Sequence, residues 1–353
     1  MRKSVWQNDA SLPKFPTLSR ELSTDVLVIG GGLAGLLTAW ELRQKGVDVV
    51  LVEKGRICAA TTAHTSAKLT AQHGLIYHKL IRSLGVEGAS QYYKANAEAV
   101  EQLKNLCHRF GAPIEEKANF VYSFDRRKLD WELDAFQKLG IPAIFVEAPP
   151  LPLSAAGAIG IPGQAQFHSL KLAASLAKEL TIYENSRVTE LIGNTATTEH
   201  GRIRAKKIVV TTHFPFLNKH GSYFLKLYQH RSYLLALENA GALDAMSLDG
   251  IPYIGQYSRN TPDLYVAAGF NKWGMTGSMV SAMLLTDLLH GKQNEYAEIF
   301  SPSRSILKPQ LLLNCAETTA NFLIPTTKRC PHLGCALKYN REERRWTIRQ
   351  MVI

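Results

Sequence analysis

Residues 24–56 read TDVLVIGGGLAGLLTAWELRQKGVDVVLVEKGR and decide the fold class, because they combine two kinds of apolar pattern. The runs at residues 25–30 and 47–53 are rich in Val, Leu and Ile, as buried strands are. The residues between them have the length and apolar spacing of a helix, from about Leu33 to Lys45. A strand, a turn, a helix and a second strand predict a βαβ unit with parallel strands.

The turn after the first strand carries three glycines in the pattern G-x-G-x-x-G, at Gly30, Gly32 and Gly35. The first permits a tight turn, the second lets a pyrophosphate approach the backbone, and the third packs the helix against the sheet. The N-terminus of the helix then offers N–H groups and the positive end of its dipole to the phosphate. Glu53 ends the second strand, where its carboxylate can accept hydrogen bonds from a ribose. The unit therefore predicts a dinucleotide site, and this pattern alone fits NAD as well as FAD.

The composition is that of an ordinary globular protein, with 353 residues of which 46% are apolar and 20% charged. Such a chain can form one large or two medium-sized domains. The formal charge of +11 comes from basic residues spread along the chain, which argues against nucleic acid as a partner and suits anionic cofactors and substrates. No charge-free stretch is long enough to span a bilayer, the N-terminus lacks the apolar core of a secretory signal, and the five cysteines are too scattered for a disulfide framework. We therefore expect a cytoplasmic protein without a membrane span.

The middle of the chain alternates helical and strand-like patterns, which indicates a second module. Two helical stretches, at residues 87–111 and 127–140, each close on a glycine at the C-cap position. Further strand-like or helical pieces lie at residues 119–124, 143–148, 165–170, 170–180, 181–193 and 202–205. The run KKIVVTTH, residues 206–213, is apolar enough to add a third strand to the first sheet.

Residues 263–291, DLYVAAGFNKWGMTGSMVSAMLLTDLLHG, repeat the order of a strand, a glycine turn and a long helix. A second unit of this kind so late in the chain predicts a dinucleotide domain that is discontinuous in sequence, with a substrate domain inserted in it. The predicted dinucleotide domain comprises residues 1–74, 168–215 and 248–300. The predicted substrate domain comprises residues 75–167 and 216–247, and it is followed by a linker at 301–324 and a separate segment at 325–353.

Several stretches beyond the glycine fingerprint resemble the D-amino-acid oxidase and glycine oxidase superfamily of flavoproteins. They are EKGRICAATTAHTSAKLT (residues 53–70), DGIPYIG (residues 249–255) and GFNKWGMTGSMVSA (residues 269–282). The resemblance implies FAD as the cofactor. A second glycine turn and helix, for which a nicotinamide-dependent dehydrogenase has no comparable need, favours the same choice, and such a dehydrogenase stays an alternative.

The resemblance also implies which residues surround the cofactor. In this family the helix that starts near Gly274 points the N–H groups of Gly274, Met275 and Thr276 at the pyrimidine end of the flavin, where negative charge collects on reduction. Val188 matches a position that contacts adenine, and Thr211 follows the third strand, although both could equally be core. Hydroxyl residues in the 61–66 loop would face pyrophosphate and ribityl oxygens or would serve only turn chemistry. The full expected set is Gly30, Gly32, Leu33, Ala34, Gly35, Glu53, Lys54, Thr62, His64, Thr65, Ser66, Val188, Thr211, Gly269, Gly274, Met275 and Thr276.

The family oxidises amines and amino acids by moving a hydride from the carbon next to nitrogen onto flavin N5, so it needs little acid–base machinery. Lys272 occupies the place where glycine oxidase has an arginine that grips the substrate carboxylate, and a lysine there keeps the charge without the bidentate fork. A solvated surface lysine is the competing interpretation. Trp273 and Tyr253 would wall an apolar pocket over the flavin, although aromatic residues more often belong to the core. The resemblance thus implies oxidation of a small amine or amino acid, with oxygen or an electron-transfer partner as the acceptor.

His64, in TTAHTSA, allows a further hypothesis. In the dimethylglycine-dehydrogenase branch of the family, a histidine at the matching distance after the strand-ending acid is bonded covalently to the flavin. A histidine near phosphates is more commonly a hydrogen-bond donor, and that interpretation stays open beside the covalent one.

The last thirty residues contain Cys330, His332 and Cys335 in CPHLGC, which resembles the first ligand box of a Rieske [2Fe–2S] domain. Such a cluster takes one Cys and one His from each of two boxes, here Cys330 and His332 from the first. No second box, C-x-x-H, follows, so we expect this chain alone not to assemble the cluster, and a zinc site would also lack one ligand. The resemblance is to a subgroup in which a flavin domain precedes a complete Rieske domain, here truncated.

A second departure lies at LALENAGALDAMSLDGIPYIG, residues 235–255, where the family normally carries several dozen more residues. Missing central strands would expose edges and apolar faces, so either the substrate domain closes in a reduced form or the active site is damaged. The expected fold is therefore α/β, with a discontinuous Rossmann-like FAD-binding domain, an inserted and incomplete α+β substrate domain and a Rieske-like fragment. The alternative function is an inactive remnant that binds FAD and turns nothing over.

Overall fold

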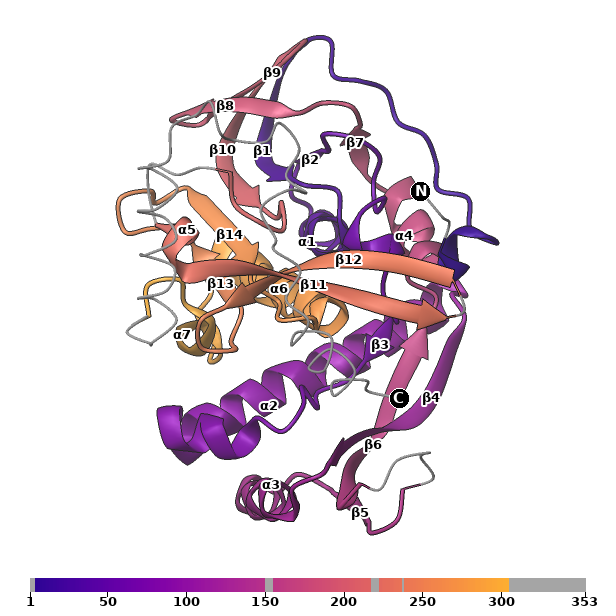
Figure 1. Cartoon of the computed structure of the whole chain (residues 1–353). Coiled ribbons are helices and arrows are strands. Elements are labelled where there is room, and N and C mark those ends of the chain that lie inside the picture. Colours follow the sequence, from indigo (N-terminus) through magenta and orange to yellow (C-terminus); the bar gives the residue numbers. More distant parts are fainter. Residues whose placement is uncertain (1–3, 150–154, 217–221, 237, 305–353) are drawn as a thin grey trace, which may run out of the picture.

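The computed structural model describes residues 4–149, 155–216, 222–236 and 238–304. Its larger sheet has the order β13-β14-β10-β1-β2-β7, with β8 and β9 continuing from β10 (Figure 1). The bounds of these strands are β1 Glu21–Ile29, β2 Val49–Val52, β7 Thr181–Tyr183, β8 Val188–Ile192, β9 Thr195–Thr198, β10 Arg202–Val210, β13 Tyr253–Gln256 and β14 Leu264–Ala268. The pairs β10–β1, β1–β2, β2–β7 and β10–β14 are parallel, whereas β13 and β9 pair antiparallel to their neighbours.

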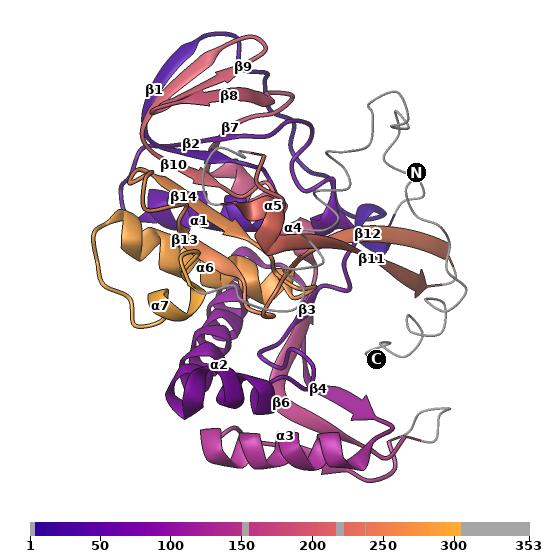
Figure 2. The ribbon, with the colours of Figure 1, turned by 60° about the vertical axis from the view of Figure 1, so that its left-hand side comes forward.

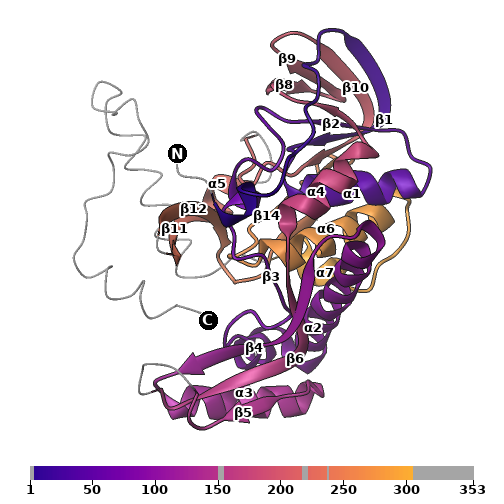
Figure 3. The same ribbon diagram turned by 90° about the vertical axis from the view of Figure 1, so that its right-hand side faces the viewer.

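Three helices cover one face of this sheet: α1 Leu33–Gln44, α4 Ser169–Lys178 and α6 Gly274–Leu289. Figure 3 shows α4, α1 and α6 side by side beneath the strands, with β8 and β9 on the other side. Val26 and Val28 of β1 face the core under the helices, whereas Leu27 and Ile29 face a second core on the opposite side. Because successive strand residues point to opposite faces, an unbroken apolar strand requires both faces to be buried, and here both are.

A smaller sheet of β3 Lys68–Leu69, β6 Gly157–Phe167, β4 Ile114–Ser123 and β5 Ile144–Val146 forms the second module, with α2 Tyr77–Phe110 and α3 Arg126–Leu139 beside it. Gly111 and Gly140 end the two helices in the left-handed conformation, as the sequence predicts. The first amides of α2 find their acceptor on α3: the wholly buried Glu132 carboxylate accepts from Tyr77 N at 2.9 Å and from His78 N at 3.1 Å. This cross-helix cap lets α2 begin ten residues before the predicted stretch, across a kink at Gly85.

Two strands, β11 Leu227–Ala236 and β12 Glu238–Ser247, form a hairpin and are paired along their whole length. The hairpin projects from the body of the molecule in Figure 2. Within the described residues these two strands make a sheet of their own. The remaining short helices are η1 Val5–Gln7, η2 Thr61–Ala63, α5 Tyr223–Lys226 and α7 Ala297–Phe300.

The mixed α/β class, the third parallel strand and the late strand–turn–helix unit are all confirmed, because β10 pairs with β1 and β14 runs into α6. One strand of the stretch expected in the dinucleotide domain, β3, pairs instead with β6 of the smaller sheet. The domain boundaries stay a prediction, and most of the expected linker and all of the segment with Cys330 and His332 lie outside the described residues. In the part of the chain that the structure describes, no helix combines the length and the apolar character needed to cross a membrane.

Candidate functional site

The carboxyl ends of β1 and β10 meet where the order of the sheet reverses, since the chain passes from β1 to β2 on one side and β10 lies on the other. Such a switch point is where open α/β sheets bind ligands. Thr211, directly after β10, donates its N–H to Ile29 O at 2.9 Å, and its hydroxyl donates to Gly30 O at 3.0 Å. Gly30 has φ +114°, and its own N–H donates to Val52 O at 2.8 Å. Thr211 thus fixes the first glycine of the turn.

The other two glycines of the fingerprint have different surroundings. A Cβ at Gly35 would lie 2.0 Å from Gly30 O, so only glycine lets α1 pack this close to β1. A Cβ at Gly32 would meet only Thr62 Oγ1, at 3.8 Å, so the space beside Gly32 is open. The N-cap residue Gly32 has no side chain to cap α1, and within the described residues the N–H groups of Ala34 and Gly35 donate to no protein acceptor. An open cradle with unpaired amides has the donor chemistry that a pyrophosphate requires.

Glu53 follows β2 on the same edge of the sheet. Its carboxylate accepts from Gly31 N at 2.8 Å and from Gly55 N at 2.9 Å, one bond to each oxygen. Each oxygen keeps a further lone pair, so the carboxylate can still accept from hydroxyl groups. Ser186 N donates to Glu53 O at 2.8 Å, which brings Val188, two residues on and 7% exposed, near this edge.

The 58–70 segment covers the turn. Thr62 Oγ1 accepts from Leu33 N, the first amide of α1, at 3.3 Å. The His64 ring places Nδ1 3.0 Å from Ala60 O, and because a carbonyl only accepts, Nδ1 carries the proton and Nε2 does not in the neutral ring. Thr65 Oγ1 accepts from Ala67 N at 3.0 Å, as turn chemistry alone would explain, while Lys54 and Ser66 are exposed.

The second glycine turn, residues 269–274, is bound to the base of the hairpin. Asn271 accepts from Ser247 N through Oδ1 and donates from Nδ2 to Ser247 Oγ, both at 2.8 Å, and its own N–H donates to Ala245 O. Gly269, Asn271 and Lys272 all have positive φ, so the turn is tightly coiled and the Asn271–Ser247 pair fixes it. A Cβ at Gly269 would lie 2.8 Å from the side chain of Leu227 and 3.3 Å from that of Ser247, which explains a glycine there.

The turn ends at Trp273, where α6 begins without a side-chain cap. Among the described residues no acceptor is found for the N–H groups of Gly274 and Met275, although the Met275 side chain is buried in the core. Thr276 differs, because its hydroxyl exchanges hydrogen bonds with the backbone of Thr70: it donates to Thr70 O at 2.9 Å and accepts from Thr70 N at 3.2 Å. The predicted flavin-facing helix is therefore attached to the segment that covers the first turn.

The three residues predicted to act on substrate have distinct positions. Lys272 is exposed at the end of the turn, and the Trp273 ring is half-buried, stacked on His73 with centroids 4.8 Å apart. Tyr253 is wholly buried under the Arg304 guanidinium, 4.0 Å from its ring centroid, and burial raises the pKa of its hydroxyl to about 12. Arg304 in turn forms a bidentate pair with Asp249, at 2.6 and 2.9 Å. Tyr253 thus lies in a packed core next to an ion pair.

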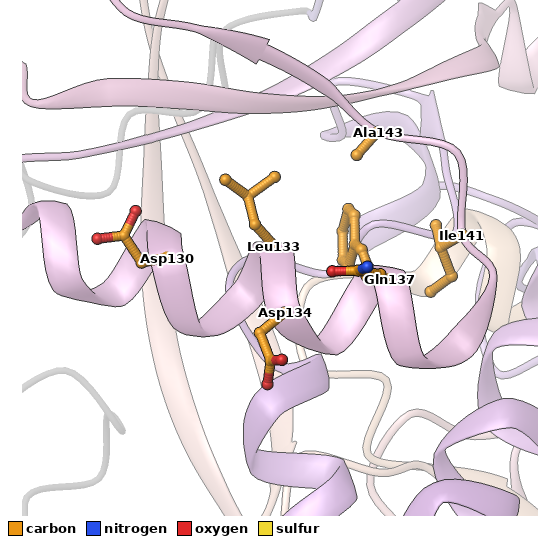
Figure 4. A pocket seen from close by; sticks show the side chains of 7 residues that line it. Asp130, Leu133, Asp134, Gln137, Ile141 and Ala143 are labelled. Carbon is orange, nitrogen blue, oxygen red and sulfur yellow. The ribbon is translucent and has the colours of Figure 1, made fainter.

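A separate hollow beside α3 is drawn in Figure 4. It is lined by Asp130, Leu133, Asp134, Phe136, Gln137, Ile141 and Ala143. Its two carboxylates are already paired along the helix, Asp130 with Arg126 at 2.9 Å and Asp134 with Lys138 at 2.6 Å. None of the predicted site residues lines it, so the hollow is distinct from the two glycine turns.

Residues 25–247 match the family described as DAO: FAD dependent oxidoreductase, over more than half of the chain. The chain belongs to this family. Its cofactor class is therefore FAD, and the expectation from the fingerprint and the three quoted stretches is confirmed at that level.

Two curated relatives differ in how much of the chain they match. A protein of Bacillus subtilis (strain 168) named "Putative Rieske 2Fe-2S iron-sulfur protein YhfW" is 28% identical over 470 residues, covering 98% of this chain and 92% of the relative. Because the chain has 353 residues, an alignment of that length contains long gaps in this chain. Gamma-glutamylputrescine oxidoreductase of Escherichia coli (strain K12) is 23% identical and covers 56% of this chain and 50% of the relative.

Solved structures share the fold at low sequence identity. Glycine oxidase from Geobacillus kaustophilus matches with a TM-score of 0.63 and 18% identity, covering 81% of this chain and 100% of that one. L-proline dehydrogenase from P. horikoshii matches with a TM-score of 0.66 and 16% identity, covering 80% of this chain and 98% of that one. These likenesses confirm the mixed α/β fold.

Sequence reasoning missed several residues that build the site. Thr70, His73, Ser247 and Asn271 hold the second turn, yet single polar residues beside apolar strands carry no signal by themselves. Cys330 and His332 lie outside the described residues, and among those described no group of three or more His, Cys, Asp or Glu side chains could hold a metal.

Proposed function

We propose that this chain binds one FAD across the two glycine turns and oxidises a small amine or amino acid. The observation that carries the proposal is the link from Leu33 through Thr62 and the 58–70 segment to Thr70 and Thr276, which joins the two turns. When bound, FAD accepts a hydride from the carbon next to the substrate nitrogen. The protein's own task is to hold and align the two molecules.

On the cofactor side, the proposal assigns the pyrophosphate to the open space at Gly32 and to the unpaired amides of Ala34 and Gly35, with Leu33, whose amide donates to Thr62, beside them. Glu53 would accept from the ribose hydroxyls, with Lys54 beside it and Val188 near the adenine. Thr62, Thr65 and Ser66 would face the pyrophosphate and ribityl oxygens. Gly30, Thr211 and Gly269 shape the backbone, and the amides of Gly274, Met275 and Thr276 would donate to the pyrimidine end of the ring system, where negative charge develops.

On the substrate side, the proposal gives Lys272 the carboxylate of the substrate and Trp273 one wall of the pocket. The support for Lys272 is its exposure at the end of a turn that two hydrogen bonds to Ser247 hold rigid. Tyr253 would contribute only as part of the pocket wall, because its side chain is wholly buried and its hydroxyl has no hydrogen-bond partner among the described residues. Names of family members, among them glycine oxidase and L-proline dehydrogenase, support an amino acid as the substrate class.

The electron acceptor is proposed as oxygen or a protein partner. The relative named as a Rieske protein supports the second choice, because electrons would then pass to an iron–sulfur centre. Cys330 and His332 would supply two of the four ligands of that centre. In the covalent variant of the proposal, His64 would bond to the flavin through its unprotonated Nε2, and protein precipitated in acid would then stay yellow.

One observation favours an inactive remnant as the second candidate. The alignment of 470 residues with the relative from Bacillus subtilis is more than 100 residues longer than this chain, so the chain has gaps in it. Loss of part of the substrate domain would leave FAD binding and remove turnover.

Two measurements separate these functions. The first is the visible spectrum of the purified protein, with iron analysis beside it: we expect flavin absorption, and a colourless protein would refute FAD binding. The second is anaerobic stopped-flow mixing of the yellow protein with a panel of amines and amino acids. Bleaching by any of them supports the oxidoreductase, whereas a bound flavin that none of them bleaches supports the remnant.

A further inference from the structure

The segment from Thr70 to His73, about 200 residues earlier in the sequence, contacts the beginning of α6 at two points. Thr70 O accepts from Thr276 Oγ1 at 2.9 Å and also lies 2.9 Å from His73 Nε2. The His73 ring stacks on Trp273, the residue at which α6 starts, with an interplanar angle of 16°. Thr70, Thr276, Trp273 and His73 therefore form a closed ring of contacts around the beginning of the helix.

The other ring nitrogen of His73 contacts α2. Tyr92, which is 1% exposed, places its hydroxyl 2.7 Å from His73 Nδ1. Since Thr70 O can only accept, Nε2 carries the proton, and Nδ1 then accepts from the Tyr92 hydroxyl. His73 itself is 5% exposed, and burial lowers the pKa of its imidazole to about 3 although the bond to Thr70 opposes this. The ring is thus neutral, in one tautomer, with both nitrogens bonded and one face on Trp273.

We propose that His73 is a positioning residue which, through Trp273 and Thr70, sets the direction of the first-turn amides of α6 toward the flavin. The inference rests on the proposed function, because it concerns the same helix and the same cofactor. It adds a residue that lies in neither glycine turn and that reaches the cofactor only through its neighbours.

The consequence is electrostatic. N–H groups stabilise a developing negative charge only when they are held at hydrogen-bond distance and in line before the charge appears. Trp273 connects α6 to the turn in which Asn271 and Lys272 have positive φ. If His73 no longer held the Trp273 ring, the backbone amides of Gly274 and Met275 could tilt. Loss of the His73 bonds should then weaken the binding of reduced FAD more than the binding of oxidised FAD. That difference lowers the midpoint potential of the bound cofactor.

The test is the variant His73→Phe, which keeps an aromatic ring and removes both hydrogen bonds. We expect a tenfold change in the relative affinity for the two oxidation states, which for a two-electron couple is about 30 mV toward lower potential. The potential is measured by dye equilibration of the FAD-loaded protein. A second readout needs no flavin: the near-ultraviolet circular dichroism of Trp273, taken as the difference from Trp273→Phe, should shrink in His73→Phe.

Tyr77→Phe is the matched control, since Tyr77 lies on α2, the helix that carries Tyr92, is wholly buried and donates its hydroxyl to Ala71 O at 2.5 Å. It should lose stability comparably and keep the potential. If His73→Phe does not fold, Tyr92→Phe removes one bond only and should shift the potential in the same direction by less. A wild-type protein that binds no FAD would refute the proposed function and this inference together. Bound FAD with one potential in wild type, His73→Phe and Tyr77→Phe, or an unchanged Trp273 signal, would overturn the inference alone.

Discussion

Replacing Gly32 by alanine should weaken FAD binding without unfolding the chain, whereas the same change at Gly35 should destabilise the fold itself. Gly32 has φ −76° and ψ 179°, which alanine adopts freely, and its added Cβ would meet only Thr62 Oγ1 at 3.8 Å. The smaller entropy of the unfolded chain and the slightly poorer N-cap are opposite effects of under about 1 kcal/mol each. The stability of the FAD-free protein should therefore hardly change.

The methyl group of Gly32→Ala would, however, fill space that the pyrophosphate needs. Overpacking of this kind costs about 1–3 kcal/mol, which corresponds to roughly a 5- to 150-fold loss of FAD affinity. In Gly35→Ala the Cβ would lie 2.0 Å from Gly30 O and 2.8 Å from Thr211 Oγ1, far inside the roughly 3.5 Å at which non-bonded atoms touch. Separating α1 from β1 should cost at least about 3 kcal/mol, or a fall in Tm of roughly 6–12 °C by the scaling for domains of 150–250 residues.

Thermal melting of the FAD-free proteins and fluorescence titration with FAD measure the two effects separately. Added FAD at 100 times the wild-type Kd should stabilise wild type by about 2.7 kcal/mol and Gly32→Ala by much less. Wild-type affinity in Gly32→Ala would refute the position given to the pyrophosphate. Wild-type melting of Gly35→Ala would refute the close approach of helix and strand.

Three further changes test other parts of the site. Asp249→Asn leaves the half-buried Arg304 without its charge partner and should cost about 1.5–3 kcal/mol in chemical denaturation, the worth of a hydrogen bond to a charged group. Burial alone would raise the pKa of the Asp249 carboxyl, but Arg304 outweighs it and holds that pKa below its ordinary value of 3.8. The stability advantage of wild type should therefore be complete above pH 3.8 and be lost as the pH falls through the lowered pKa. Lys272→Met should raise KM for amino acids roughly 10- to 100-fold, because one hydrogen bond to a charged group is lost. KM for an amine without a carboxylate should stay constant. Equal effects on both substrates would contradict the role assigned to Lys272. Asn271→Gly keeps the positive φ and removes two bonds to Ser247, so a loss of about 2 kcal/mol is expected by thermal melting, and no loss would show that the pair is dispensable.

The sequence was sufficient for the βαβ unit and for the glycine caps, because each depends on neighbouring residues. An apolar run of strand length is followed by Gly30, Gly32 and Gly35 at spacings that only one kind of turn uses, and the glycines at 111 and 140 lie where a left-handed residue must end a helix. The late unit around Gly274 was predicted for the same reason. The start of α2 was not, because its first amides are capped by Glu132 from another helix, 55 residues away in sequence.

What only the tertiary structure decided is how the two turns are held together. His73 and Trp273 are 200 residues apart, Thr70 and Thr276 are 206, and Asn271 and Ser247 belong to separate elements, so no local pattern connects the members of these pairs. Local backbone preferences determine which segments turn, because glycine, which lacks a Cβ, adopts turn conformations that other residues avoid. A hydrogen bond between distant segments depends on both partners arriving at one place, and that follows only from the packing of the whole chain.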